Sequence, residues 1–579
     1  MLRKIFRWFV RAAITLVVLF AIALLSDYLA HRVASGSVLV VKLRGPVVER
    51  GPTGLLSAFG PSQTPLNVLR RAITKAEKDP RIVGLAVEET DPQMELAQAQ
   101  EIVTLIKHFK ATGKWTAAYM ETAGDFGPGN LPYIVASATG DVAMMPEGEL
   151  NIVGVGMREI FARGTLDWLG ITPNFAAIGA YKTAGNIFTE KDFTAAQREE
   201  DDSLIGGMYD QIVAAISAER AIKPDDVKAL IDQAPLSPKA GLKAHLIDHI
   251  EYLDQFTDGV KHHGGVRHDL VQYTDYGQPG MLSGLGVKDK IAVIYCDGEI
   301  VRGPSQGFGM TGGKVIGSDD LVDAFKTARE DDSVRAIVLR VNSPGGSVVA
   351  SELIRRAAVL AAKKKPIVVS MSGYAASGGY WISTPAKFMV AEPGTVTGSI
   401  GVLGGKFNLS PAAQKIYLNT GPVTRGANVE MFDEFTDFTP AQATMFKDQI
   451  LGETYQHFLQ IVAKSRHLTV EDVDQIAQGR VWTGQQALGN KLIDEMGGFN
   501  KALAEAKKLA NIPPEREVVL EELPEMPGLL ERILSGRFAQ AASLGPALKN
   551  FAPALVAVRA ALSGNGLFCV AYCPVVPVL

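Results

Sequence analysis

Cysteine and histidine are both scarce in this chain. Its 579 residues include three cysteines (Cys296, Cys569 and Cys573) and nine histidines. No disulfide framework or cysteine metal site can therefore organise the fold, although Cys569 and Cys573 could pair in an oxidising compartment. A net charge of −4 and a pI near 6.2 give no sign of the basic face typical of nucleic-acid binders, so no nucleic-acid partner is expected. The composition, 47 % hydrophobic and 21 % charged, is that of a folded protein, and the length predicts more than one domain.

One long apolar run stands at the N-terminus, from Ala12 to Leu25. It is preceded by four basic residues, Arg3, Lys4, Arg7 and Arg11. A basic flank on this side predicts a cytoplasmic N-terminus, with the rest of the chain across the membrane. The run is short for a span, but Trp8–Val10 extend it if Arg11 snorkels to the headgroups. We favour an uncleaved transmembrane anchor, and a cleaved signal peptide stays open as the alternative.

The chain contains two copies of one unit. Residues 37–51 are echoed by 290–303, and aligning their shared glycine gives an offset of 298 − 45 = 253. Further along, Tyr133 aligns with Tyr380 at an offset of 380 − 133 = 247. Such a gradual drift is what a few deletions would produce, whereas chance matches would scatter. We divide the chain into a cytoplasmic tip with its anchor (1–35), a first repeat (36–275), a second repeat (276–525) and a C-terminal tail of unknown role (526–579).

Apolar runs alternate with helical patterns in the second repeat. Strands are predicted at 291–296, 336–341 and 366–371, helices at 321–329 and 348–363, a turn at 342–346 and an inter-repeat linker at 259–288. Strands that alternate with helices predict an α/β fold with largely parallel strands.

Ser377 is the candidate nucleophile. It lies where a predicted strand meets a predicted helix and is followed by Gly378 and Gly379. Such a turn presents the serine Oγ at the carboxyl edge of the sheet, although the motif alone is more often a capping serine. Gly345 and Gly346 follow the preceding strand, where their N–H groups could form an oxyanion hole or belong to an ordinary turn.

The general base is not evident among the histidines. None of the nine lies in a glycine-rich turn beside a plausible nucleophile. That leaves lysine, which becomes a competent base when burial lowers its pKa.

Three strings, Asn342–Ser347, Tyr374–Trp381 and Thr397–Val402, resemble those of signal peptide peptidase A in its long, duplicated form, and the resemblance extends from about Val38 to Leu523. It implies a Ser/Lys serine endopeptidase made of two tandem crotonase/Clp-protease-like units. It also implies a single-pass protein of the bacterial inner membrane, with its catalytic domains facing the periplasm, and a homo-oligomer, for which we expect a tetramer. The expected substrates are peptides, plausibly cleaved signal peptides, and no metal or organic cofactor is needed.

The resemblance also assigns residue roles. It makes Lys182, in Tyr181–Gly185, the general base, and it implies that Ser399 orients this lysine. The repeat alignment bears on the pair independently. Lys182 maps to 182 + 246 = 428, which is asparagine, and Ser377 maps back to 377 − 247 = 130, also asparagine. Each repeat thus keeps one member of the pair, as duplication followed by division of labour would produce. Two alternatives stay open: a catalytically inert membrane scaffold, and an acyl-CoA-binding crotonase-like protein.

Overall fold

The computed structural model describes residues 32–51, 62–280, 286–287, 289–305, 313–525 and 568–572, together with positions 14, 15 and 18. The chain divides into two compact units, the first made of Met1–Met94, Ile102–Gly154 and Val213–Val287, the second of Glu95–Glu101, Val155–Ile212 and Lys288–Leu579. Val155–Ile212, which the sequence places in the first repeat, therefore belongs to the second unit. No helix within the described ranges is long and apolar enough to cross a membrane. The predicted anchor falls almost entirely outside those ranges.

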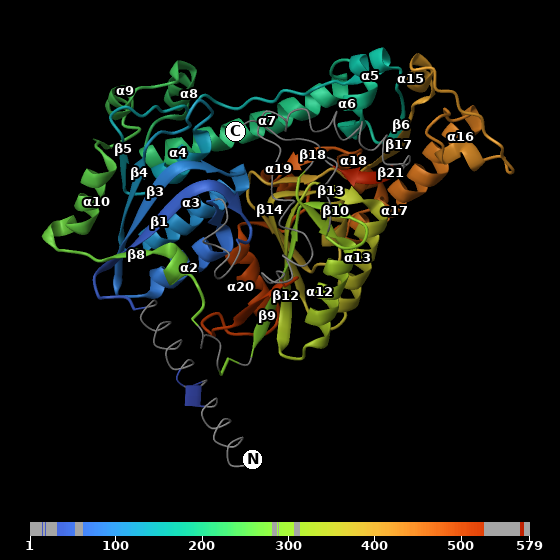
Figure 1. Cartoon of the computed structure of the whole chain (residues 1–579). Coiled ribbons are helices and arrows are strands. Elements are labelled where there is room, and N and C mark those ends of the chain that lie inside the picture. Colours follow the sequence, from blue (N-terminus) through green and yellow to red (C-terminus); the bar gives the residue numbers. More distant parts are fainter. Residues whose placement is uncertain are drawn as a thin grey trace, which may run out of the picture. The chain divides into compact units, whose positions relative to one another are not determined.

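The first unit contains one parallel sheet with the order β2-β1-β3-β4-β5-β7, and β8 pairs with β1. Its strands are β1 (Ser37–Val48), β2 (Thr64–Pro65), β3 (Ile82–Gln93), β4 (Trp115–Met120), β5 (Asp141–Met144), β7 (His249–Ile250) and β8 (Leu270–Gln272). Helices of this unit include α2 (Leu66–Lys78), α4 (Asn130–Ser137), α8 (Pro224–Gln233), α9 (Pro238–Lys243), α10 (Leu253–Lys261) and α11 (Tyr273–Tyr276) (Figure 1). The linker prediction for 259–288 is wrong in part, because β8 and α11 are ordered elements of this sheet unit.

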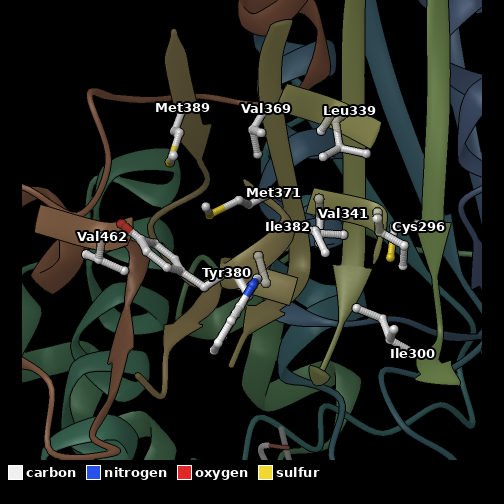
Figure 2. Packing of buried hydrophobic residues seen from close by; sticks show 14 of the residues in the cluster. Cys296, Ile300, Leu339, Val341, Val369, Met371, Tyr380, Ile382, Met389 and Val462 are labelled. Atoms are coloured by element: carbon white, nitrogen blue, oxygen red, sulfur yellow. The ribbon is translucent and has the colours of Figure 1, made fainter. Parts of the chain in front are cut away.

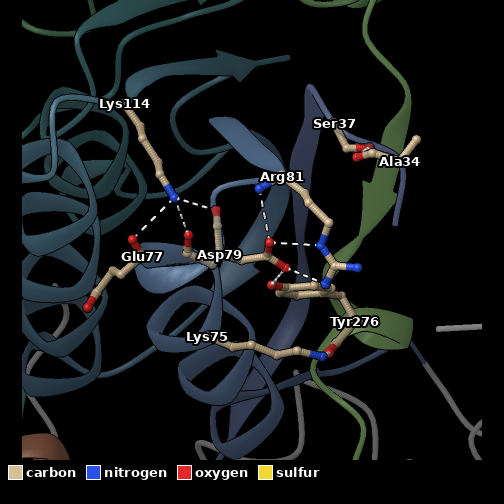
Figure 3. Close-up of polar contacts among 9 residues, drawn as sticks. Ala34, Ser37, Lys75, Glu77, Asp79, Arg81, Lys114 and Tyr276 are labelled. Atoms are coloured by element: carbon tan, nitrogen blue, oxygen red, sulfur yellow. Dashed lines mark hydrogen bonds and ion pairs between the residues drawn. The ribbon is translucent and has the colours of Figure 1, made fainter. Parts of the chain in front are cut away.

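Polar contacts fix the end of α2 in the first unit (Figure 3). The ammonium of Lys114 donates to the carbonyls of Ala76, Glu77 and Asp79, which end the helix without intrahelical partners. The Asp79 carboxylate accepts hydrogen bonds from Arg81 and from the Tyr276 hydroxyl. The Arg81 hydrogen bond is the main reason why the pKa of Asp79 lies well below its usual value.

The main sheet of the second unit has the order β18-β16-β14-β12-β9-β20, with β15 beside β14 and β19 beside β15. All of these pairs are parallel except β16 with β18. The strands are β9 (Lys290–Asp297), β12 (Val334–Ser343), β14 (Ile367–Ala376), β15 (Phe388–Ala391), β16 (Val396–Gly398), β18 (Val481–Thr483), β19 (Glu495–Met496) and β20 (Val519–Leu523). The three strands predicted for this repeat and the parallel α/β architecture are confirmed.

Helices of the second unit cover both faces of this sheet. The two predicted helices are present as α12 (Ser318–Glu330) and α13 (Val348–Ala362). The remaining ones are α5 (Arg163–Leu169), α6 (Asn186–Thr189), α14 (Gly378–Ser383), α15 (Ser410–Lys415), α16 (Pro440–Thr444), α17 (Gly452–Arg466), α18 (Val470–Ile476), α19 (Gly484–Gly489) and α20 (Phe499–Leu509). Helices α3 (Leu96–Ala111) and α7 (Ala195–Arg220) run through segments of both units.

Alternate residues of the central strands are buried on opposite faces of the sheet. Ile294 and Leu339 belong to the cluster that includes α12 and α13, and Val293 and Val338 pack with α20. Figure 2 shows the first cluster around Tyr380, whose hydroxyl donates to the carbonyl of Leu492. Because strands buried on both faces carry few polar side chains, they produce the continuous apolar runs seen in the sequence.

A second sheet of this unit has the order β11-β10-β13-β21-β17-β6. Its strands are β6 (Thr172–Ile178), β10 (Glu299–Val301), β11 (Val315–Gly317), β13 (Gly345–Ser347), β17 (Val402–Asn408) and β21 (Phe568–Tyr572). The turn predicted at 342–346 is therefore wrong in detail, because β12 runs to Ser343 and Gly345 already begins β13.

The two units share one topology and several of its side-chain contacts. The order β1-β3-β4-β5-β7 in the first matches β9-β12-β14-β15-β19 in the second. Arg220 pairs with Asp248 as Arg466 pairs with Asp494, and 466 − 220 and 494 − 248 both equal 246. Equivalent contacts at the sequence offset of the repeats are what a duplication would leave.

Candidate active site

Ser377 lies at the junction of β14 and α14, between Ala376 and Gly378. Its backbone is left-handed, with φ 55° and ψ −112°, a conformation that is costly for a residue with a side chain. The strain is held by two backbone hydrogen bonds, from Ser377 N to Gly398 O and from Trp381 N to Ser377 O, each 2.8 Å long. The Ser377 side chain makes no capping hydrogen bond to α14, and a strained strand-to-helix turn of this kind is typical of nucleophile elbows.

Strand β6 brings Lys182 to this serine. It pairs antiparallel with β17, and its last residue, Ile178, lies opposite Val402, the first residue of β17. Four residues beyond Ile178, Lys182 caps the short helix Thr183–Gly185. The start of β17 follows Ser399 closely in sequence. The register between the two strands therefore places the lysine beside both serines.

The ammonium nitrogen of Lys182 lies 2.7 Å from Ser377 Oγ, 3.0 Å from Ser399 Oγ and 3.1 Å from the Ser399 carbonyl oxygen. All three residues are buried, with 3 %, 0 % and 2 % of their surfaces exposed. Burial disfavours a charged amine, and a neutral amine is the form that can accept a proton. The sequence-predicted residues Lys182, Ser377 and Ser399 thus meet in a single hydrogen-bonded cluster.

The loop 478–481 packs against the backbone of Lys182 and hydrogen-bonds to the residues around it. Tyr181 N donates to Gln478 O, and Ser399 N donates to Arg480 O. Gly479 has φ +81°, and a Cβ built on it would lie 2.5–2.6 Å from the backbone and Cβ of Lys182. Only glycine fits so close to the lysine. Sequence analysis did not identify this loop, because it lies far along the chain from both serines.

Glu200, on α7, ties the same loop to the lysine segment. Its Oε1 accepts from Val481 N at 2.6 Å, and its Oε2 accepts from Thr183 Oγ1 at 3.4 Å. Burial raises the pKa of the Glu200 carboxyl to about 8, and the nearby charges of Asp201 and Lys182 act in opposite directions. The neighbouring Glu199 accepts from Tyr181 Oη and pairs with Arg480 at 2.8 Å. Sequence analysis missed both carboxylates.

Gly345 and Gly346, the predicted oxyanion donors, lie next to Gly378, the residue that follows Ser377. A Cβ on Gly378 would lie 3.1 Å from both Gly345 Cα and Gly346 N, so the two segments touch. Gly378 opens α14, where backbone N–H groups lack intrahelical acceptors. Gly345 N donates to Ser343 Oγ at 3.2 Å. Sequence analysis did not consider the Gly378 N–H as an oxyanion donor, although this residue directly follows Ser377.

The corresponding position in the first unit holds no such cluster. Asn130 opens α4, is fully buried, and exchanges side-chain hydrogen bonds with the backbone of Gly154. These bonds give it a structural role. A hollow of about 630 Å³ in this unit is lined by Tyr119, Tyr252, Asp254 and others, and it contains no serine or cysteine nucleophile.

Comparison with known proteins assigns the sequence to a family. The profile of peptidase family S49 matches residues 108–267 and 360–513. The chain belongs to peptidase family S49. Its relatives in this family include the chloroplastic serine protease SPPA of Arabidopsis thaliana, 33 % identical over 89 % of this chain and 75 % of the relative. Protease 4 of Haemophilus influenzae is 33 % identical over 76 % of this chain and 72 % of its own length.

The resemblance inferred from the three motif strings is therefore confirmed, and this S49 chain is a serine peptidase. Among solved structures, a membrane-bound stomatin-specific protease aligns over 41 % of this chain and 99 % of its own, with 15 % identity and a TM-score of 0.26.

Proposed function

We propose that this S49 peptidase is a membrane-anchored endopeptidase that cleaves peptides with a Ser377–Lys182 dyad. The observation that carries the proposal is the 2.7 Å separation of Lys182 Nζ from Ser377 Oγ inside a buried cluster. Serine peptidases need a base at this distance, and within 32–51, 62–280, 286–287, 289–305 and 313–525 no histidine hydrogen-bonds to Ser377. A duplicated crotonase/Clp-protease-like fold would explain why the two members come from different repeats.

The proposed chemistry is acyl transfer in two steps. Neutral Lys182 takes the proton of the Ser377 hydroxyl while Oγ attacks the peptide carbonyl. The proposed oxyanion donors are the backbone N–H groups of Gly346 and Gly378, together with that of Gly345, which must exchange its hydrogen bond to Ser343 Oγ for one to the oxyanion. The lysine then returns the proton to the leaving amine. Water then attacks the acyl ester and gives a proton to Lys182, which passes it to Ser377 Oγ as the ester bond breaks and the carboxylate product leaves. Ser399 orients the Lys182 amine toward Ser377 Oγ by accepting hydrogen bonds at its carbonyl and hydroxyl oxygens.

The cellular setting is also part of the proposal. The basic flank and apolar run of residues 1–35 favour a single-pass anchor in a bacterial inner membrane, with the catalytic unit facing the periplasm. The substrates proposed for such a site are remnant signal peptides, with apolar residues near the scissile bond. We further propose a homo-oligomer, expected to be a tetramer.

Peptide turnover by site variants tests the proposal. A quenched fluorescent peptide with an apolar core is incubated with the full chain, Ser377→Ala and Lys182→Met. We expect both variants to lose at least about 1,000-fold in kcat/KM while melting near the wild-type temperature. His457→Ala is the control, because this histidine contacts Trp381 on α14 but has no part in the dyad. Full activity in Lys182→Met would show that the base is elsewhere, and an inert wild type would favour the scaffold alternative.

Membrane association is tested separately. The full chain and a form lacking residues 1–35 are expressed in a bacterium and fractionated with alkaline carbonate washes. We expect only the full chain to stay in the membrane pellet. Recovery of both forms in the soluble fraction would contradict the anchor.

A further inference from the structure

Arg480 lies where the segments that carry the active site come together. Its guanidinium carbon lies 4.7 Å from the centre of the Tyr181 ring and 4.6 Å from the centre of the Trp482 ring. The Nη1 nitrogen pairs with Glu199 Oε1 at 2.8 Å. Within the described part of the chain, the Arg480 Nε is buried without a hydrogen-bond partner. Two aromatic rings and one carboxylate therefore hold the guanidinium, by cation–π contacts and an ion pair.

Tyr181 connects this arginine to the proposed base. It directly precedes Lys182 in the chain, and its hydroxyl donates to Glu199 Oε2 at 3.0 Å. Glu199, on α7, thus accepts one hydrogen bond from Tyr181 and one from Arg480, so the three side chains form a closed set of contacts. Because Arg480 holds the ring and Glu199 holds its hydroxyl, the turn that carries Lys182 is fixed from its N-terminal side.

The backbone of Arg480 is connected to the two serines. Its carbonyl oxygen accepts a hydrogen bond from Ser399 N at 2.7 Å. The next residue, Val481, begins β18 and lies opposite Gly398 in the antiparallel pairing with β16. The Gly398 carbonyl accepts in turn from Ser377 N at 2.8 Å. One residue therefore contacts the lysine segment through its side chain and the serine segments through its backbone.

The first unit contains the corresponding loop without the arginine. Its bridge between Leu150 and Leu236 corresponds to the antiparallel pairing of β16 with β18, at offsets of 397 − 150 = 247 and 482 − 236 = 246. At the second offset, Arg480 corresponds to position 480 − 246 = 234, which is Ala234. The loop itself is thus common to both units, whereas the arginine is present only in the unit that contains the serine–lysine cluster.

We propose that Arg480 is a positioning residue, which holds the turn of Lys182 in register with the two serines by stacking on Tyr181. The inference rests on the proposed function, because it takes Lys182 to be the base. It adds that the base depends on a fixed cation outside the dyad. Because the contacts of Arg480 set the geometry of the proton transfer, its loss should lower kcat and leave KM nearly unchanged.

Steady-state kinetics with the quenched peptide test this role. We expect Arg480→Ala to lower kcat at least about 30-fold, with KM within about twofold of wild type. Arg480→Lys should recover little of the loss, because an ammonium group has no planar face to stack between two rings. Arg198→Ala is the matched control, since Arg198 also lies over an aromatic ring, 4.7 Å from the centre of Phe193, but is outside the closed set of contacts. We expect this control to behave as wild type.

Rescue by a small cation separates positioning from a general loss of structure. We expect ethylguanidinium at millimolar concentration to raise the kcat of Arg480→Ala at least about fivefold, and ethylammonium to have no effect, because only the guanidinium ion can stack between the rings. Wild type and Arg198→Ala should respond to neither ion. A loss confined to KM in Arg480→Ala, or no rescue by ethylguanidinium, would overturn the inference.

Two variants of Tyr181 test the stacking if Arg480→Ala does not fold. Tyr181→Phe keeps the ring and loses the hydroxyl, whereas Tyr181→Leu loses the ring. We expect kcat to be at least about tenfold lower in the leucine variant than in the phenylalanine variant, because the ring is the surface on which the guanidinium lies. Equal kcat in the two variants would contradict the stacking role.

A double-mutant cycle distinguishes this inference from the proposed function. The rate at which a fluorophosphonate probe labels Ser377 is measured in Arg480→Ala, Lys182→Met and the double variant. We expect Arg480→Ala to cause no further fall once Lys182 is replaced, because no base is left to position. A full additional fall in the double variant would overturn the inference and leave the dyad intact. Wild-type labelling in Lys182→Met would instead contradict the proposed function itself.

Discussion

At the residue scale, the site depends on close packing around one amine. Lys182 is buried with its nitrogen shared between two serines. Its backbone lies against Gly479, where any side chain would displace it. The identities of Ser377 and Lys182 follow from motif strings and the repeat offset. The contact with Gly479 does not, because its cause is a distance between remote loops rather than a local pattern.

Replacing Gly479 tests this packing. Gly479→Ala adds a Cβ 2.5 Å from Lys182 N in a left-handed backbone, so the lysine must move. We expect kcat to fall at least about 100-fold with a modest change in KM, since a displacement of about 1 Å has effects of that size. Gly489→Ala is the matched control, because nothing lies within 4 Å of its added Cβ. Wild-type kcat in Gly479→Ala would show that the loop does not position the base.

Replacing Ser399 tests whether this residue orients the amine of Lys182. Its hydroxyl oxygen lies 3.0 Å from Lys182 Nζ, and its carbonyl oxygen remains in any variant. We therefore expect Ser399→Ala to lower kcat about 10-fold and to leave KM unchanged, the loss of one hydrogen bond of two. Steady-state kinetics measure both constants. A fall confined to KM would instead assign Ser399 to substrate binding.

At the element scale, strand pairing assembles the site. The sequence predicts the strands and helices of the second repeat closely, because strands buried on both faces give continuous apolar runs. It does not predict that β6, from the first repeat, joins a sheet with β17. Pairing between strands more than 200 residues apart leaves no local signal in the sequence. The repeat alignment could therefore link Lys182 with Ser377, whereas the predicted strands and helices could not.

Glu200 should stabilise this arrangement through its contacts with Thr183 and Val481. Glu200→Gln keeps an acceptor for Val481 N, whereas Glu200→Ala leaves that buried N–H without one. We expect the alanine variant to lose about 10-fold or more in kcat and the glutamine variant to retain most of it. Equal losses in both would mean that the carboxyl group itself, rather than the hydrogen bond to Val481, is required.

At the scale of the whole molecule, the second unit buries several carboxyl groups. Burial raises the pKa of Glu392 to about 8, and Glu101 adds to the shift while Arg340 opposes it. Arg340 itself forms a buried ion pair with Glu101 at 2.7 Å. Sequence analysis did not predict these buried carboxyl groups, because the sequence around a charged residue does not show which partner will lie beside it in the fold.

Stability should therefore fall as pH rises. A carboxyl group whose folded pKa is raised binds its proton more tightly in the folded state, so its contribution is fully present below its unfolded pKa. That contribution is lost between about pH 4.5 and the folded value of about 8 for Glu392. We expect the melting temperature of the full chain to fall between pH 6 and pH 9, and Glu392→Gln to flatten that decline. The same slope in Glu392→Gln and wild type would exclude this residue as the cause.

The central claim is that a lysine from the first repeat activates a serine in the second. The most direct measurement is the rate at which a fluorophosphonate probe labels Ser377 in the full chain, with the site located by peptide mass spectrometry. We expect rapid labelling of Ser377 in wild type, and a rate at least about 100-fold lower in Lys182→Met with unchanged melting behaviour. Equally fast labelling of Ser377 in Lys182→Met, or labelling of a different serine in wild type, would contradict the split Ser377–Lys182 site.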